Sequence, residues 1–136
     1  MPKNPNHRSG EPSQRQLRAG ELIRHALVDI LAREDLRDPA LQGVSVTIGE
    51  VRASPDLKQA VVFCAPLGDR DLDHAREVAA GLNRAARFLR GRLGREIDMK
   101  FTPELRFLAD ESYEAAAEMN ALLASPEIRP DWTDDD

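Results

Sequence analysis

Residues 43–65, GVSVTIGEVRASPDLKQAVVFCA, decide the fold class of this 136-residue chain. Residues 43–48 alternate with a period of two, which is typical of a half-buried strand. The alternation slips at Gly49-Glu50, where a β-bulge fits because glycine tolerates one. A turn signal at residues 53–56 precedes a more apolar segment, residues 57–65. We therefore expect an antiparallel hairpin whose second strand is the more central one.

A helix is predicted before the hairpin. Ser13 and Gln16 have the spacing of a capping box, so the helix starts at Ser13. Asp38-Pro39 ends this region, because the residue before a proline is pushed out of the α conformation. Apolar residues at helical spacing form the expected core stripe, namely Ala19, Ile23, Ala26, Leu27, Ile30 and Leu31.

A second helical region follows the hairpin. Asp71 or Asp73 caps it, and Gly94 is predicted to end it. Gly81 and Gly91 leave two alternatives open for residues 72–93, a straight helix or a kinked pair. The predicted core stripe consists of Leu82, Ala85, Ala86, Leu89 and Leu93. Phe88 falls off this stripe, and we expect it to be buried against the neighbouring helix.

The clearest strand pattern covers residues 97–109, where apolar and polar residues alternate. Pro103 cannot donate to a strand ladder, so this is an edge strand or it is broken there. Asp110-Glu111-Ser112 then opens a short C-terminal helix. The apolar residues of this alternation are expected to face the core, and they are Ile97, Met99, Phe101, Leu105, Phe107 and Ala109.

The predicted element order is α-β-β-α(α)-β-α, an α+β fold with a three-stranded sheet and helices on one face. We expect a single domain over residues 13–124. Residues 1–12 are predicted to be a disordered arm, and residues 125–136 a disordered acidic tail.

Composition excludes several classes of protein. No run approaches about 18 apolar residues, so a membrane span is not expected. The N-terminal residues have no apolar stretch typical of a secretory signal, so we expect a cytoplasmic protein. The one cysteine, Cys64, lies in an apolar strand and is predicted to be a core residue. No nucleophile–base pair, metal-ligand spacing or phosphate-binding glycine loop is present, so we expect no enzyme, no cofactor and no metal.

The net charge of −5 is unevenly distributed along the chain. Residues 108–136 carry −8 and residues 1–107 carry +3. Leu82–Arg95 holds five arginines and no acid, and arginine suits phosphate recognition. These residues are Arg84, Arg87, Arg90, Arg92 and Arg95. Two alternatives stay open for them, a polyanion-binding face and the solvated face of a surface helix.

Residues 91–94 also match GxxG, the loop with which KH domains hold a nucleic-acid backbone. Two glycines at this spacing often occur by chance, and a helix stop explains Gly94 better. With aromatic residues at only 4%, base stacking is not the obvious binding mode.

An ordered set of segments resembles the ribosome-binding factor A family from about Gln14 to Leu123. The segments are Ala40–Thr47 after Asp38-Pro39, Val51–Ala60 before an apolar strand, Ala85–Gly94, Thr102–Phe107 and Asp110–Ser112. The resemblance implies a single type II KH-like domain, α-β-β-α-(kink)-α-β. It also implies an interhelical kink of Ala-x-Gly type in place of a working GxxG loop. The matching residues are Ala85, Ala86 and Arg87, so arginine stands where glycine is expected.

The resemblance further implies a non-catalytic assembly factor. Its partners are the free small (30S) ribosomal subunit and its 16S rRNA, whose late maturation it supports, with a link to growth in the cold. We expect a monomer with no membrane contact and no small-molecule substrate. Expected rRNA contacts are Arg84, Arg87, Arg90, Arg92 and Arg95, with Arg15, Arg18 and Arg24 from the first helix and Lys100 and Arg106 as weaker candidates. The alternative is a KH-like protein-interaction module whose arginine face binds an acidic protein.

Overall fold

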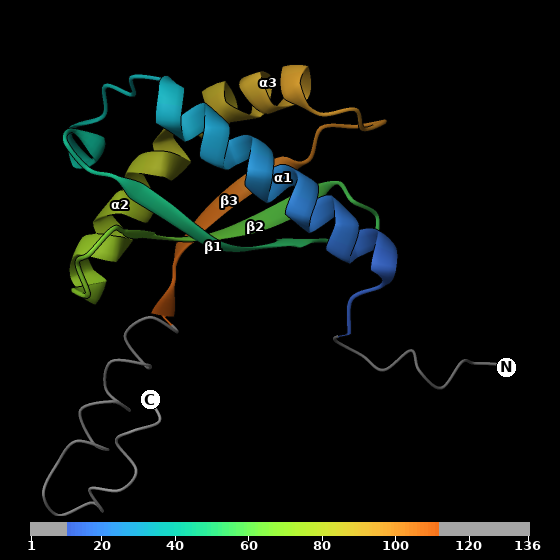
Figure 1. Cartoon of the computed structure of the whole chain (residues 1–136), viewed down its shortest axis with the longest axis horizontal. Coiled ribbons are helices and arrows are strands. Elements are labelled where there is room, and N and C mark those ends of the chain that lie inside the picture. Colours follow the sequence, from blue (N-terminus) through green and yellow to red (C-terminus); the bar gives the residue numbers. More distant parts are fainter. Residues whose placement is uncertain (1–10, 112–136) are drawn as a thin grey trace, which may run out of the picture.

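The computed structural model describes residues 11–111, which form a three-stranded sheet with helices on one of its faces (Figure 1). This confirms the predicted α+β class. Residues 1–10 of the predicted arm, the acidic tail and nearly all of the predicted C-terminal helix lie outside the described residues. The elements are α1 (Gln14–Arg33), the 3-10 helix η1 (Pro39–Leu41), β1 (Val46–Ala53), β2 (Gln59–Pro66), α2 (Leu72–Arg84), α3 (Ala86–Glu96) and β3 (Glu104–Ala109).

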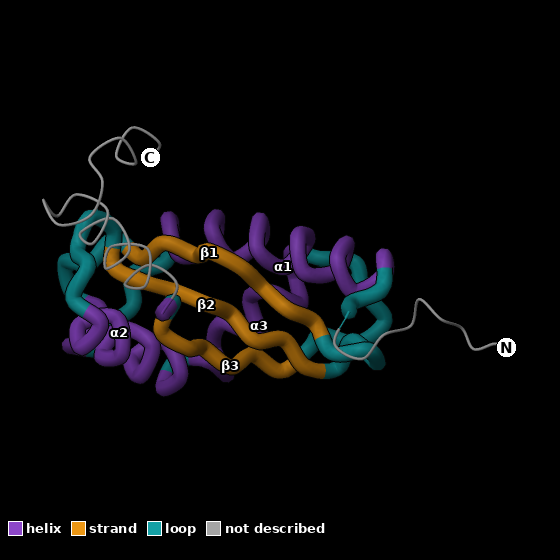
Figure 2. Tube along the Cα trace, turned by 90° about the horizontal axis from the view of Figure 1, so that it is seen from below, coloured by secondary structure: helices purple, strands orange, loops and turns teal. Residues whose placement is uncertain are grey.

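The sheet has the order β1-β2-β3, so the predicted central position of the second strand is confirmed. β1 and β2 are antiparallel, and their register shifts between Ile48 and Glu50, where the sequence predicts the bulge. β3 runs parallel to β2 at the edge of the sheet. The helices lie behind the strands in Figure 2, which leaves the near face of the sheet uncovered by them.

The hydrophobic core lies between the sheet and the helices. Each helix contributes fully buried apolar side chains to one core cluster, which also contains Val62 of β2 and Phe107 of β3. Burying a side chain of this size stabilises the fold by roughly 1.5–3 kcal/mol relative to leaving it exposed. The fully buried helical residues are Ile23, Leu27 and Ile30 of α1, Val78 and Leu82 of α2, and Leu89 and Leu93 of α3.

α1 begins where the capping box predicts. The Gln16 backbone N–H donates to Ser13 Oγ at 3.1 Å, and the Ser13 backbone N–H donates to Gln16 Oε1 at 2.9 Å. Gln16 Nε2 also donates to the carbonyl of Ala53 at 2.9 Å, which joins the helix start to the end of β1. A Cβ at position 20 would lie 2.4 Å from the Val51 carbonyl oxygen, so Gly20 permits the close approach of α1 to β1.

Residues 72–93 form two helices, one of the two alternatives that the sequence left open. Asp71 caps α2 by accepting from the Asp73 backbone N–H at 3.0 Å. α2 ends at Arg84 and α3 begins at Ala86. Ala85 between them has φ −97° and ψ 6°, outside the helical conformation. The break therefore falls on the first residue of the stretch where the family resemblance implies a kink.

The prediction that Gly94 ends the helix is wrong, because α3 continues to Glu96. A Cβ at position 94 would lie 2.8 Å from Thr102 Oγ1. Glycine at this position therefore serves a close approach between α3 and the following loop. The GxxG match at residues 91–94 lies inside α3 and forms no interhelical loop.

The strand predicted over residues 97–109 is broken at Pro103, as the sequence allowed, since β3 begins only at Glu104 and lies at the edge of the sheet. Pro103, which has no N–H for the ladder, is fully buried immediately before it. The residues before Pro103 leave the strand direction, so Phe101 does not face the core and is 54% exposed. Phe88 is 43% exposed, and its predicted burial against a neighbouring helix is therefore wrong.

Candidate nucleic-acid interface

Five arginines lie at the α2–α3 junction and along α3, and we call them the arginine face. Leu89 and Leu93 bury the opposite side of α3. The members of the arginine face are Arg84, the last residue of α2, and Arg87, Arg90, Arg92 and Arg95 of α3. The structure gives these five side chains different surroundings.

Arg87 and Arg95 are exposed and stand on the side of α3 that faces away from the core. Within residues 11–111, neither makes a hydrogen bond or an ion pair with another side chain. Gly91 lies between them on the same side, and a Cβ there would meet nothing within 4 Å. This part of the helix surface therefore offers two guanidinium groups and open space around them.

Arg84 is held by an acid from a distant part of the chain. Its Nε and Nη2 donate to the two carboxylate oxygens of Asp38 at 2.6 and 2.9 Å. Asp38 also accepts from the Ala40 backbone N–H at 3.0 Å. These contacts, the arginine first, lower the pKa of Asp38 from its usual 3.8 to about 2. The pair joins η1 to the end of α2, while Arg84 remains 58% exposed.

Arg90 and Arg92 flank the exposed side of α3. Arg90 contacts the loop that follows α3, and Arg92 contacts the residue that follows α1. Arg90 donates from Nε and Nη2 to the carbonyl of Thr102 at 3.1 and 2.8 Å, so its charge has a neutral partner. Arg92 pairs with Glu34, just after α1, at 3.3 Å. Its guanidinium also lies 5.1 Å from the centre of the Phe88 ring. Of these two charges, an acid offsets only that of Arg92.

The candidate arginines of α1 form a separate group. Arg15 and Arg18 are exposed and have no ion-pair partner in the described part of the chain. Arg33, which pairs with Glu96 of α3, lies about 27 Å from Arg15 along the helix axis. Arg15 and Arg18 therefore stand well away from the contact between α1 and α3.

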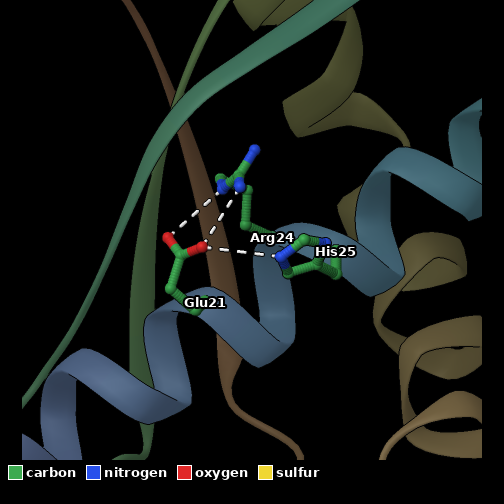
Figure 3. Close-up of polar contacts among 3 residues, drawn as sticks. All are labelled: Glu21, Arg24 and His25. Carbon is green, nitrogen blue, oxygen red and sulfur yellow. Dashed lines mark hydrogen bonds and ion pairs between the residues drawn. The ribbon is translucent and has the colours of Figure 1, made fainter.

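Arg24 differs from Arg15 and Arg18 because an acid of the same helix holds it. Its Nε and Nη2 donate to Glu21 at 3.2 and 3.1 Å, and His25 Nε2 lies 3.6 Å from the same carboxylate (Figure 3). The Arg24 hydrogen bonds lower the pKa of Glu21 below its usual value. Arg24 is consequently a weaker candidate for contacting a further anion.

Two exposed aromatic rings beside cations were not predicted as part of a site. Phe88 lies beside Arg92, and this i,i+4 pair is visible in the sequence. Phe101 has Lys58 and Lys100 at 5.7 and 5.6 Å from its ring centre. No signal in the sequence identified this second group, because the alternation placed Phe101 in the core. Arg106, the other weak candidate, is exposed on β3.

The surroundings of Cys64 confirm that it is a core residue. The side chain is fully buried, and burial, followed by the charge of Asp110, raises the pKa of its thiol to about 12. Among residues 11–111, no three His, Cys, Asp or Glu side chains are grouped so that they could hold a metal ion. None of the helices in this range has both the length and the apolar character needed to cross a membrane.

Comparisons with known proteins identify the family. The family model for ribosome-binding factor A matches residues 15–123. The ribosome-binding factor A of Maricaulis maris is 58% identical over 131 residues, which cover 96% of this chain and 91% of that protein. The corresponding protein of Phenylobacterium zucineum is 61% identical over 122 residues, covering 90% and 82% of the two chains.

Solved structures of relatives have the same fold. A Thermotoga maritima protein described as a putative ribosome binding factor A is 30% identical, with a TM-score of 0.58 and coverage of 74% and 91% of the two chains. The Thermus thermophilus ribosome-binding factor A, at 24% identity and a TM-score of 0.57, covers 71% and 97% and supports the fold alone. These likenesses are consistent with the KH-like fold that the resemblance implies. From the family-model match and the identities to its members, this chain belongs to the ribosome-binding factor A family.

Proposed function

We propose that this protein binds the free small (30S) ribosomal subunit through its rRNA and supports late maturation of the 16S rRNA without catalysing a reaction. Membership of a family named for ribosome binding supports this function. The structural observation that carries it is the exposed pair Arg87 and Arg95, which have no side-chain partner among residues 11–111. By the same resemblance, we propose that the protein acts as a monomer in the cytoplasm and supports growth in the cold.

The geometry of α3 suits contact with an RNA backbone. Arg87 and Arg95 lie about 12 Å apart along the helix axis, so they reach two separate phosphates. The planar guanidinium group of arginine can donate two hydrogen bonds to phosphate oxygens. Such contacts position a protein on RNA without reading the base sequence. The folded rRNA then supplies specificity through its shape.

The other members of the arginine face have smaller or indirect roles in this proposal. Asp38 and Glu34 partly offset the charges of Arg84 and Arg92. Arg90 keeps its full charge beside the Thr102 carbonyl and adds to the positive potential. Arg15 and Arg18 form a second contact at the other end of α1, and Arg24 contributes least because Glu21 holds it.

The test is binding of the purified protein to free small subunits at several salt concentrations. The double variant R87Q/R95Q should bind more weakly and show a shallower salt dependence. The slope of log K against log salt should fall by about 0.7–0.9 for each phosphate that the variant no longer neutralises. R52Q/R76Q is the matched control, because it removes two arginines that already pair with Glu50 and Asp73 outside the arginine face.

Unchanged binding and slope for R87Q/R95Q would overturn the assignment of the arginine face. If the wild-type protein sediments with mature ribosomes and ignores free small subunits, the proposed function itself is wrong. Binding that survives nuclease treatment and targets a protein would favour the alternative of an interaction module for an acidic partner.

A further inference from the structure

The loop between α3 and β3 presents an aromatic ring to solvent between two lysines. Phe101 is 54% exposed, and it is one of the most exposed large apolar side chains in the described range. The ammonium groups of Lys58, from the β1–β2 turn, and Lys100 lie over the ring, 5.7 and 5.6 Å from its centre. Two segments far apart in sequence thus bring an apolar ring and two positive charges together.

Neither lysine is held by an ion pair with an acid among residues 11–111. Asp56 is the acid nearest to Lys58 in the turn, and its carboxylate accepts from the Ser54 hydroxyl at 2.7 Å and from the Lys58 backbone N–H at 3.0 Å. Asp56 therefore fixes the turn that carries Lys58. The charges of the two residues attract each other, but they form no ion pair, so the ammonium group can still contact an outside anion.

The backbone on either side of the Phe101 ring is held in place by several contacts. Arg90 holds the Thr102 carbonyl with two hydrogen bonds, and the absence of a side chain on Gly94 lets Thr102 lie against α3. Pro103 is fully buried, and the Glu104 backbone N–H donates to the Lys58 carbonyl at 2.9 Å. A ligand that binds here therefore orders little additional chain, which favours affinity.

We propose that Phe101 is a stacking platform for an unpaired nucleotide of the rRNA. The base takes the ring face over which a lysine ammonium group lies in the free protein, and Lys58 and Lys100 move onto the phosphates beside that nucleotide. This site rests on the proposed function and adds to it a contact with a base. Aromatic rings stack on every base, and neighbouring cations hold the strand, so the site recognises single-stranded RNA with little sequence preference. Arg90 connects the platform to the arginine face through its hydrogen bonds to the Thr102 carbonyl.

The test compares three variants with wild-type protein for binding to free small subunits across salt concentrations. F101L keeps an apolar side chain but removes the ring face, and it should weaken binding about tenfold with an unchanged salt slope. F101W should bind at least as well as wild type, because it restores a stacking surface. K58Q/K100Q should make the slope shallower by about 1.4.

Leu67→Ala is the matched control, since Leu67 is 67% exposed in the β2–α2 loop and has no place in the proposed platform. The platform is overturned if F101L binds like wild type, if F101W is no better than F101L, or if L67A weakens binding equally. These outcomes are distinct from failure of the proposed function, in which the wild-type protein itself does not bind free small subunits.

Discussion

Asn83 of α2 and Phe107 of β3 exchange two hydrogen bonds across 24 residues of sequence. Asn83 Oδ1 accepts from the Phe107 backbone N–H at 2.8 Å, and Nδ2 donates to the Phe107 carbonyl at 2.9 Å. β3 is an edge strand, whose outer backbone groups have no neighbouring strand in the described sheet. The Asn83 carboxamide supplies the hydrogen bonds that a neighbouring strand would otherwise make. It also fixes the end of α2, two residues before the break at Ala85.

Removing this carboxamide should destabilise the protein. Asn83→Ala loses two hydrogen bonds, which together contribute about 1–3 kcal/mol to the free energy of unfolding. Asn83→Asp keeps the acceptor, but at neutral pH its carboxylate faces the Phe107 carbonyl without a donor. Its stability relative to Asn83→Ala should therefore improve on acidification, when the carboxyl group gains a proton. Denaturant unfolding measures both effects, and an Asn83→Ala variant as stable as wild type would contradict this role.

The Asp38–Arg84 pair should make the stability of the protein depend on acidic pH. The folded-state pKa of Asp38, about 2, is depressed below its usual 3.8. The stabilisation is therefore fully present above about pH 4 and is lost as the pH falls towards about 2. NMR titration should place the Asp38 inflection near pH 2 in wild type and higher in R84Q. An inflection that does not move in R84Q would show that Arg84 is not its main cause.

Replacing each of two helical glycines by alanine should change the stability of the protein in opposite directions. A Cβ at position 20 would meet the Val51 carbonyl oxygen at 2.4 Å, so Gly20→Ala must separate α1 from β1 and should cost about 1–3 kcal/mol. A Cβ at position 91 meets nothing within 4 Å, so Gly91→Ala should stabilise α3 by about 0.5–1 kcal/mol. Thermal unfolding of the two variants gives the comparison. Equal changes in melting temperature would contradict the difference in packing.

Cys64 should react with alkylating reagents only when the chain unfolds. The thiol is fully buried and its pKa is raised to about 12, so almost no thiolate is present at neutral pH. Iodoacetamide labelling, followed by mass spectrometry, should be slow in buffer and fast in denaturant. Labelling of the native protein at the rate of a free cysteine would contradict the burial.

Much of the fold could be predicted because its determinants are local. The capping box at Ser13, the Asp71 cap, the bulge near Gly49 and the apolar stripes of the helices each depend on residues close together in sequence. A periodic pattern states which side of an element is apolar, and burial of that side follows from the hydrophobic effect. The arginines were found in the same way, as a cluster without acids between residues 82 and 95.

Two of the differences between prediction and structure involve contact between segments distant in sequence. Alternation extended the last strand back to Ile97, but the strand begins only after Pro103, so Phe101 is exposed beside two lysines. Gly94 resembled a helix stop, whereas its role is the approach of Thr102. Pro103 locally marks where the strand breaks, but no local pattern predicts that Lys58 lies over Phe101 or that Thr102 approaches Gly94.

By itself, the sequence determined the helices, the hairpin, the core stripes and the family, because these depend on short-range patterns and on ordered motifs. Only the tertiary structure decided which charges are available to a partner. Arg84 meets Asp38 and Arg92 meets Glu34, whereas Arg87 and Arg95 meet no acid within residues 11–111. The reason is physical, since an ion pair forms wherever folding brings opposite charges within a few ångströms, however far apart they lie along the chain.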